Sequence, residues 1–216
     1  MTEAGDPVRH TTNRVRPVVL RAGNEIEDPS KVVLGFLDAH RPFEFEISDR
    51  SATASFGELD LRLANRGGAR VSAVEIVAIL ERRRAIERAL RAIAPDASLA
   101  GAASEVPWLP MRKLFDTFGG IRGVGFSKMT KALHPKRPSL IPMLDSVVQK
   151  YLADDDLGAR AAFGERALEL VRGYKRDLDR NRAAVRAVRQ ELARRRYSLT
   201  EVRILDLLIW SVEAAA

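Results

Sequence analysis

Residues 111–150 read MRKLFDTFGGIRGVGFSKMTKALHPKRPSLIPMLDSVVQK, and the way this stretch folds decides the architecture around it. The apolar spacing predicts one helix over 109–118 and a second over 125–133, and a glycine pair and a proline end them. The connection from Ile121 to Gly125 needs glycine, because so tight a turn requires positive φ and brings backbone N–H groups close to a ligand. The stretch therefore predicts two short helices around a tight turn.

The start of the second helix is a candidate anion site. Exposed N–H groups at a helix N-terminus attract a negatively charged ligand, and neighbouring basic side chains add to that attraction. A Gly-x-Gly before a helix also occurs in turns that only connect two helices, so a purely structural turn is the alternative. If the site is real, its ligand is a phosphate group, and the residues expected to bind it are Arg122, Gly123, Gly125, Ser127, Lys128 and Lys131.

The rest of the chain shows helical periodicity almost throughout. Ser72 with Glu75 three residues later forms a capping box at the start of the helix expected over 72–93. The alternating residues 43–47 predict one short strand or extended piece. The fold class is therefore all-α, a compact multi-helix domain with at most a minor β element. The further helices are expected at 31–40, 57–63, 72–93, 145–152, 157–179, 185–192 and 200–210.

The chain divides into an arm and a helical domain in this interpretation. Residues 1–27 carry prolines and scattered charge without a period, which predicts a flexible N-terminal arm. The helical domain then covers 28–216. Residues 95–107 are rich in Ala, Ser and Gly and read as a linker, so two lobes, 28–94 and 108–216, are an alternative division.

Composition excludes several classes of protein. The chain has 216 residues and no cysteine, which rules out disulfides, thiolate zinc sites and cysteine-ligated iron–sulfur clusters, and three histidines argue against any metal centre. The apolar runs are too short to cross a bilayer, and the N-terminus lacks the apolar core of a secretory signal. The sequence contains no phosphate-loop, dinucleotide-binding or zinc-protease motif, and nothing in it suggests a bound organic cofactor. We expect a cytoplasmic protein without cofactor or metal, outside the membrane.

The distribution of charge indicates a polyanion as partner. The formal net charge is +7, and seven basic residues face one acid between 111 and 137. Twelve basic residues face five acids between 160 and 196, with Arg182, Arg186 and Arg189 at helical spacing on one face. Two basic segments on an otherwise acidic chain are typical of a protein that binds nucleic acid, although Arg-rich helices can also be simply solvated.

The stretch resembles the helix-hairpin-helix motif, whose turn is hydrophobic-x-Gly-hydrophobic-Gly. Ile121, Gly123, Val124 and Gly125 match it, which places the motif at 111–134. It looks more specifically like the form found in the base-excision DNA glycosylase superfamily, where a proline-containing loop and an Asp open the next helix. The residues in register with that pattern are Pro142, Asp145, Ser146, Val148 and Lys150.

The resemblance implies a role for Asp145. In the superfamily this Asp helps the flipped base depart, either by stabilising positive charge on the sugar or by activating a water. Bifunctional members carry a Schiff-base Lys two residues after the second glycine, where this chain has Ser127, so a monofunctional mechanism is implied. Val147 stands where the family has His, and no base-recognition pocket is evident, which counts against an enzyme. An ordinary helix cap is the structural alternative for Asp145.

Three functions follow as hypotheses. The first is a helix-hairpin-helix protein that binds DNA through backbone phosphates, without catalysis. The second is an active monofunctional DNA glycosylase that uses Asp145, and the third is a helical module that binds another protein. The layout, with PSLIPMLDSVV at 138–148 and ILDLLIW at 204–210, is also similar to a family of uncharacterised bacterial proteins, which has no established activity to carry over.

Overall fold

The computed structural model describes residues 16–39 and 54–213, and these residues form an all-α domain with one two-stranded antiparallel sheet. The expected fold class is confirmed. The expected strand at 43–47 lies outside the described residues. The elements are β1 (Val18–Val19), β2 (Glu25–Ile26), α1 (Pro29–Ala39), α2 (Glu58–Arg66), α3 (Ala73–Glu81), α4 (Arg83–Arg91), α5 (Trp108–Asp116), α6 (Phe126–Leu133), α7 (Ser146–Tyr151), α8 (Phe163–Arg180), α9 (Arg182–Arg194) and α10 (Glu201–Glu213).

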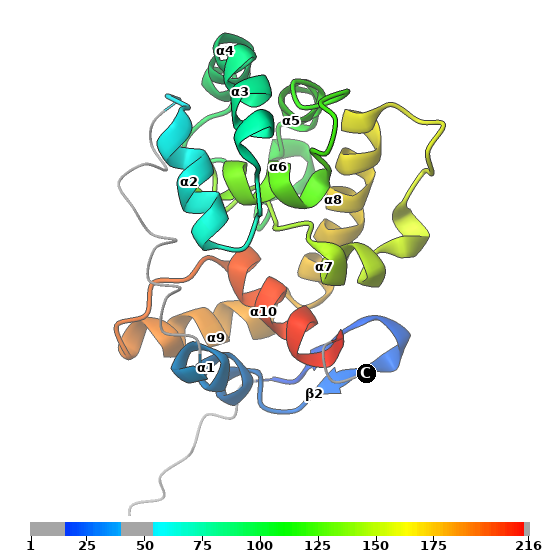
Figure 1. The fold of residues 1–216 in the computed structure, drawn as a ribbon. Helices are drawn as coiled ribbons and strands as arrows, with labels where there is room; N and C mark the ends of the chain where they lie inside the picture. The colour runs from blue at the N-terminus through cyan, green and yellow to red at the C-terminus, as the bar shows by residue number, and fades with distance from the viewer. Residues whose placement is uncertain (1–15, 40–53, 214–216) are drawn as a thin grey trace, which may run out of the picture.

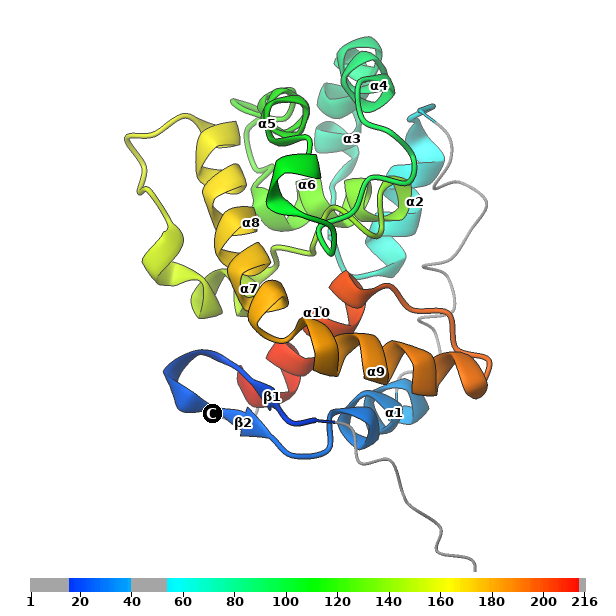
Figure 2. The same ribbon diagram turned by 180° about the vertical axis from the view of Figure 1, so that it is seen from behind.

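The helices are arranged in two halves (Figure 1). Helices α2 to α6 gather in one half, while α1, α9, α10 and the β1–β2 hairpin gather in the other, and α8 runs from one half to the other. The view from behind shows the same grouping (Figure 2). Within the described residues the buried apolar side chains form one continuous cluster across both halves. The apolar faces that the periodicity predicts therefore meet in a single core.

Residues 16–27 are not part of a flexible arm, which corrects the expectation for 1–27. Val18 and Leu20 are fully buried, and the amide of Val19 donates to Asn181 Oδ1 at 2.8 Å. Asn181 Nδ2 returns a bond of 2.8 Å to the carbonyl of Val19. Asn181 lies 162 residues from Val19 in the sequence, so no local pattern could predict this contact. Residues 1–15 lie outside the described part of the chain.

The helix expected over 72–93 is two helices, α3 and α4, that meet at Arg82. Its capping box is confirmed, because Ser72 N donates to Glu75 Oε2 at 2.8 Å and Ser72 Oγ accepts from Glu75 N at 3.4 Å. Arg82 leaves helical geometry, with φ −92° and ψ 3°, and its guanidinium donates to the carbonyls of Thr117 and Gly119 at 3.1 and 2.6 Å. The break therefore attaches α3 and α4 to the loop after α5.

The segment 95–107 does not separate two lobes. Leu99 and Val106 are buried, and the amide of Leu99 donates to the carbonyl of Ser139 at 2.9 Å. Helix α1 packs on α9 and α10, whereas α2 packs on α6, so the packing units are not continuous in sequence. A division into 28–94 and 108–216 is therefore not the one the structure shows.

Candidate nucleic-acid interface at the helical hairpin

Helices α5 and α6 and the turn between them form the expected helical hairpin. Gly120 and Gly123 have φ of +74° and +81°, values in the left-handed region that favours glycine. The amide of Val124 donates to the carbonyl of Ile121 at 3.1 Å, and both of these side chains are buried beneath the turn. The glycines therefore form the tight turn, and the two buried apolar residues fix it to the core.

The N-terminus of α6 is open. Gly125 caps it with φ −96° and ψ −174°, and no side chain bonds to the cap. The first N–H groups of a helix have no partner within the helix, so they remain available to a ligand. A Cβ added at Gly125 would meet nothing within 4 Å. Arg122, Gly123 and Gly125 are exposed and Ser127 is half-buried, so four of the expected phosphate-binding residues lie together at this tip.

Lys128 is not the free cation that the sequence suggested. Its Nζ lies 2.6 Å from Glu75 Oε1 and 2.7 Å from Oε2, and both side chains are mostly buried. Burial would raise the pKa of Glu75, but the bonds from Lys128 and Ser72 outweigh it and lower the pKa. Glu75 also lies against Gly123, where a Cβ would stand 2.2 Å from Oε1. A carboxylate of α3 therefore closes one side of the hairpin.

Lys131 turns away from the tip of the hairpin. It is half-buried, and its Nζ donates to the carbonyl of Gly68 at 3.4 Å. Burial lowers its pKa, the positive charges of Arg203 and Arg70 lower it further, and the negative charge of Asp145 acts in the opposite direction. Of the expected phosphate ligands, Lys131 is the one whose charge interacts with that of Asp145.

Asp145 caps α7 and is 8% exposed. Its Oδ1 accepts from the amides of Val147 and Val148, both at 3.1 Å. Its Oδ2 accepts from the indole Nε1 of Trp210 on α10 at 2.8 Å. The expected helix cap is thus present, and the indole bond also fixes the second oxygen, so the carboxylate is held in one orientation.

Asp206 is a buried carboxyl group that the sequence analysis missed. It is 1% exposed on α10, and its Oδ2 accepts from the amide of Met143 at 3.4 Å. No hydrogen-bond partner of Oδ1 is present among the described residues. Burial raises its pKa to about 8, and the charge of Asp145 adds to this rise, while Arg203 opposes it. The only sequence signal was an Asp within the apolar run 204–209.

The sequence charge count overstates the basic surface around the hairpin. Lys136 is 2% exposed and pairs with Asp60 at 2.8 Å. Arg137 is buried at the C-terminal end of α4, where it donates to the carbonyls of Leu90 and Ile93, each at 2.9 Å. These charges stabilise the fold and do not face a ligand. The basic residues of 111–137 that remain exposed are Arg112, Lys113 and Arg122.

In the described ranges 16–39 and 54–213, no three His, Cys, Asp or Glu side chains are grouped so that they could hold a metal ion. Among those same residues, every helix is too short or too polar to cross a membrane.

The fold and the hairpin define a compact all-α protein built around a helix pair with a glycine turn. The chain belongs to a family of unknown function (DUF6308), whose model matches residues 53–213. That match includes the hairpin, Asp145 and Asp206. Comparison with curated proteins and with solved structures finds no match.

Proposed function

We propose that the α5–α6 hairpin binds the phosphate backbone of DNA, without reading its sequence. The observation that carries this proposal is the uncapped N-terminus of α6, with Arg122 and the backbone of Gly125 exposed beside it. Helix N-termini and turns with successive free N–H groups bind phosphate by geometry and by the positive end of the helix dipole. Contacts of this kind fix a protein on the duplex without base recognition.

Glu75 determines the side from which a phosphate approaches. Its carboxylate lies against Gly123 and neutralises Lys128, so this face repels an anion. Arg122, Gly125 and Ser127 have no hydrogen bond or ion pair with a carboxylate among the described residues. The phosphate therefore binds at Gly125 and Ser127, with the exposed Arg122 as its cation, and Lys128 holds the hairpin to α3.

A salt titration with a matched pair of variants tests the proposal. Purified protein is titrated with a labelled duplex between about 50 and 200 mM salt, since each neutralised phosphate contributes about −0.9 to the slope of log K against log salt. Arg122→Glu should weaken binding and flatten the slope by about one contact. Lys31→Glu, an equal reversal at an exposed site on α1, should leave both nearly unchanged. Equal effects of the two variants, or a flat wild-type slope, contradict the proposal.

A second candidate function is base excision, with Asp145 as the catalytic carboxylate. The observation that favours it is that two groups with shifted pKa, Lys131 and Asp206, lie within electrostatic reach of Asp145. A carboxylate fixed by Trp210 and by helix amides would stabilise the positive charge that develops on the sugar as the base leaves.

Asp145→Asn tests the second function, because it removes the negative charge while the single side-chain oxygen of asparagine still caps α7; the amide nitrogen replaces the oxygen that accepts from Trp210, so that bond is lost. Uracil-, hypoxanthine- and alkylated-base duplexes are incubated with the protein and assayed for abasic sites. The glycosylase hypothesis predicts abasic sites with the wild type, none with Asp145→Asn, and unchanged DNA affinity. Abasic sites formed equally by both proteins, or by neither on any of these duplexes, contradict it.

A further inference from the structure

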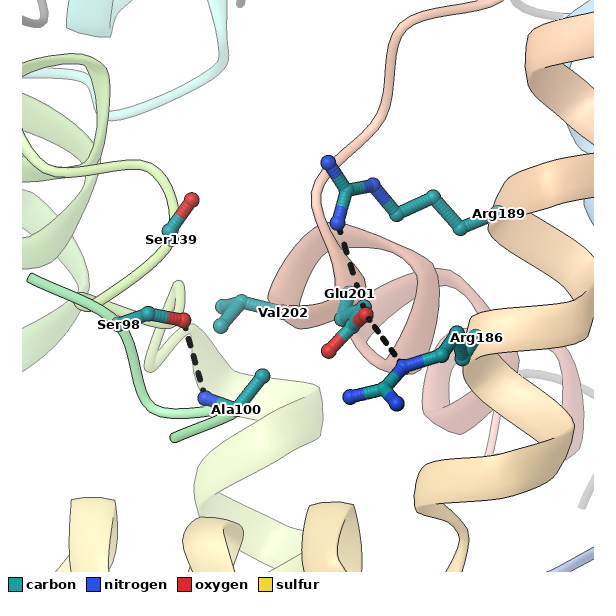
Figure 3. Close-up of a pocket in the computed structure, with 7 residues that line it drawn as sticks. All are labelled: Ser98, Ala100, Ser139, Arg186, Arg189, Glu201 and Val202. Carbon is teal, nitrogen blue, oxygen red and sulfur yellow. Dashed lines mark hydrogen bonds and ion pairs between the residues drawn. The ribbon is translucent and has the colours of Figure 1, made fainter. Parts of the chain in front are cut away.

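A cavity of about 250 Å³ lies between the basic face of α9 and the segments that carry Ser98 and Ser139 (Figure 3). Arg186 and Arg189 extend into it from α9, and Glu201 at the start of α10 lies between them. Ser98 and Ser139 line the opposite wall. The lining is mostly polar, so an apolar ligand does not fit it.

The two guanidinium groups keep most of their donors free. Arg186 Nε lies 3.7 Å and Arg189 Nη1 3.5 Å from the same oxygen of Glu201, which is at or beyond the limit of a hydrogen bond. Glu201 is 7% exposed, whereas the side chains of Arg186 and Arg189 are 56% and 58% exposed. One buried carboxylate therefore holds two guanidinium groups at the cavity and leaves most of their N–H donors available to a ligand. Two positive charges and one negative charge leave the local charge positive.

The opposite wall supplies hydroxyl groups on a fixed backbone. The amide of Leu99 donates to the carbonyl of Ser139, which joins the two segments, and Ser98 Oγ accepts from the amide of Ala100 at 3.1 Å. The Ser139 hydroxyl has no bond to the other residues drawn in Figure 3. Hydroxyl donors facing two arginines form the donor set that phosphate oxygens require.

A second cavity of about 230 Å³ adjoins the first and shares Arg189. Arg196 and Tyr197 line it, just after the end of α9. Arg196 has φ of +67°, in the left-handed region that glycine would occupy without strain. An arginine in that position places a third cation beside the shared Arg189, at the expense of local backbone geometry.

We propose that these adjoining cavities bind a ligand with two linked phosphate groups. Arg186, Arg189 and the Ser139 hydroxyl hold one phosphate, and Arg189 and Arg196 hold the other. Such groups occur in nucleic-acid strands and in free phosphorylated compounds, and the chemistry of the site is the same for both. The site is separate from the hairpin, because no residue that lines either cavity belongs to α5, α6 or the turn between them.

Inorganic pyrophosphate is the probe, titrated calorimetrically into the full chain at low salt. Arg189→Ala should lower the affinity about tenfold or more, since it removes charge-assisted bonds to both phosphates. Arg194→Ala is the matched control: it lies on the same helix, is 70% exposed and pairs with Glu191, but lines neither cavity. Arg196→Gly guards against misfolding, because glycine suits that backbone and the variant should still lose affinity.

A DNA-binding experiment with the same variants distinguishes the two sources of phosphate. If a strand is the ligand, Arg189→Ala also lowers DNA affinity and pyrophosphate competes with DNA; if a free compound is the ligand, DNA affinity is unchanged. Gly125→Ala in the hairpin should leave pyrophosphate binding intact in either case, so failure of the hairpin proposal is distinguishable. The inference is overturned if the wild-type protein does not bind pyrophosphate and Arg189→Ala does not change DNA affinity. Equal effects of Arg189→Ala and Arg194→Ala also overturn it.

Discussion

Gly123→Ala should destabilise the protein for two separable reasons. An L residue at φ +81° costs about 1–2 kcal/mol. The new Cβ would also stand 2.2 Å from Glu75 Oε1, so the carboxylate must move away. That movement loosens its bond to Lys128 and the capping box with Ser72, and the loss of a cap is worth about 1 kcal/mol. We expect a total loss of about 2–3 kcal/mol.

Urea unfolding followed by circular dichroism measures this loss, and the melting temperature should fall by roughly 4–12 °C. Gly120→Ala is the first control, because its φ is +74° but its Cβ meets nothing within 4 Å, so only the backbone cost remains. In the double variant with Glu75→Ala, the loss should be less than additive, because the overlap is already gone. The contact with Glu75 would be refuted if Gly123→Ala lost no more stability than Gly120→Ala, and if the losses from Gly123→Ala and Glu75→Ala were additive in the double variant.

Three further predictions concern the core. Because burial raises the pKa of Asp206 to about 8, the contribution of Asp206 to stability is fully present below about pH 4 and is lost as pH rises to about 8; Asp206→Asn should remove this part of the pH dependence. Lys136→Met should cost about 3–5 kcal/mol in urea unfolding, because it breaks the buried ion pair with Asp60; a smaller loss in the double variant with Asp60→Asn, which keeps an oxygen for the amide of Gly57, would confirm the pair. Asn181→Ala should cost about 1–3 kcal/mol and speed amide exchange at Val19, because it removes the two hydrogen bonds that hold β1 to Asn181. Unchanged exchange at Val19 would contradict this attachment.

The helices could be predicted because their causes are local. The periodicity of apolar residues, the Ser72 capping box and the glycines of the hairpin all act within a few residues of one another, and the structure places helices where they indicate. The break at Arg82 was not predicted, and the carbonyl groups of Thr117 and Gly119 that the Arg82 side chain binds there are distant in sequence.

The candidate site was predicted less completely, because ion pairing is not local. Lys128 looked like a phosphate ligand until the fold brought Glu75, 53 residues away in sequence, into contact with it. Arg137 and Lys136 counted as surface charge, yet both are buried against α4 and α2. Asp145 as a helix cap was visible in the sequence, whereas its bond to Trp210 spans 65 residues and needed the structure.

The most direct test of the central claim is DNA affinity of Gly125→Ala over a salt series. The φ of −96° suits alanine and its Cβ meets nothing in the protein, so the variant should fold like the wild type. Gly35→Ala, at another open position on α1, is the matched control. A phosphate against the α6 N-terminus predicts about a tenfold loss for Gly125→Ala and no loss for Gly35→Ala. Equal, wild-type affinity for both would show that the hairpin is not the DNA-binding surface.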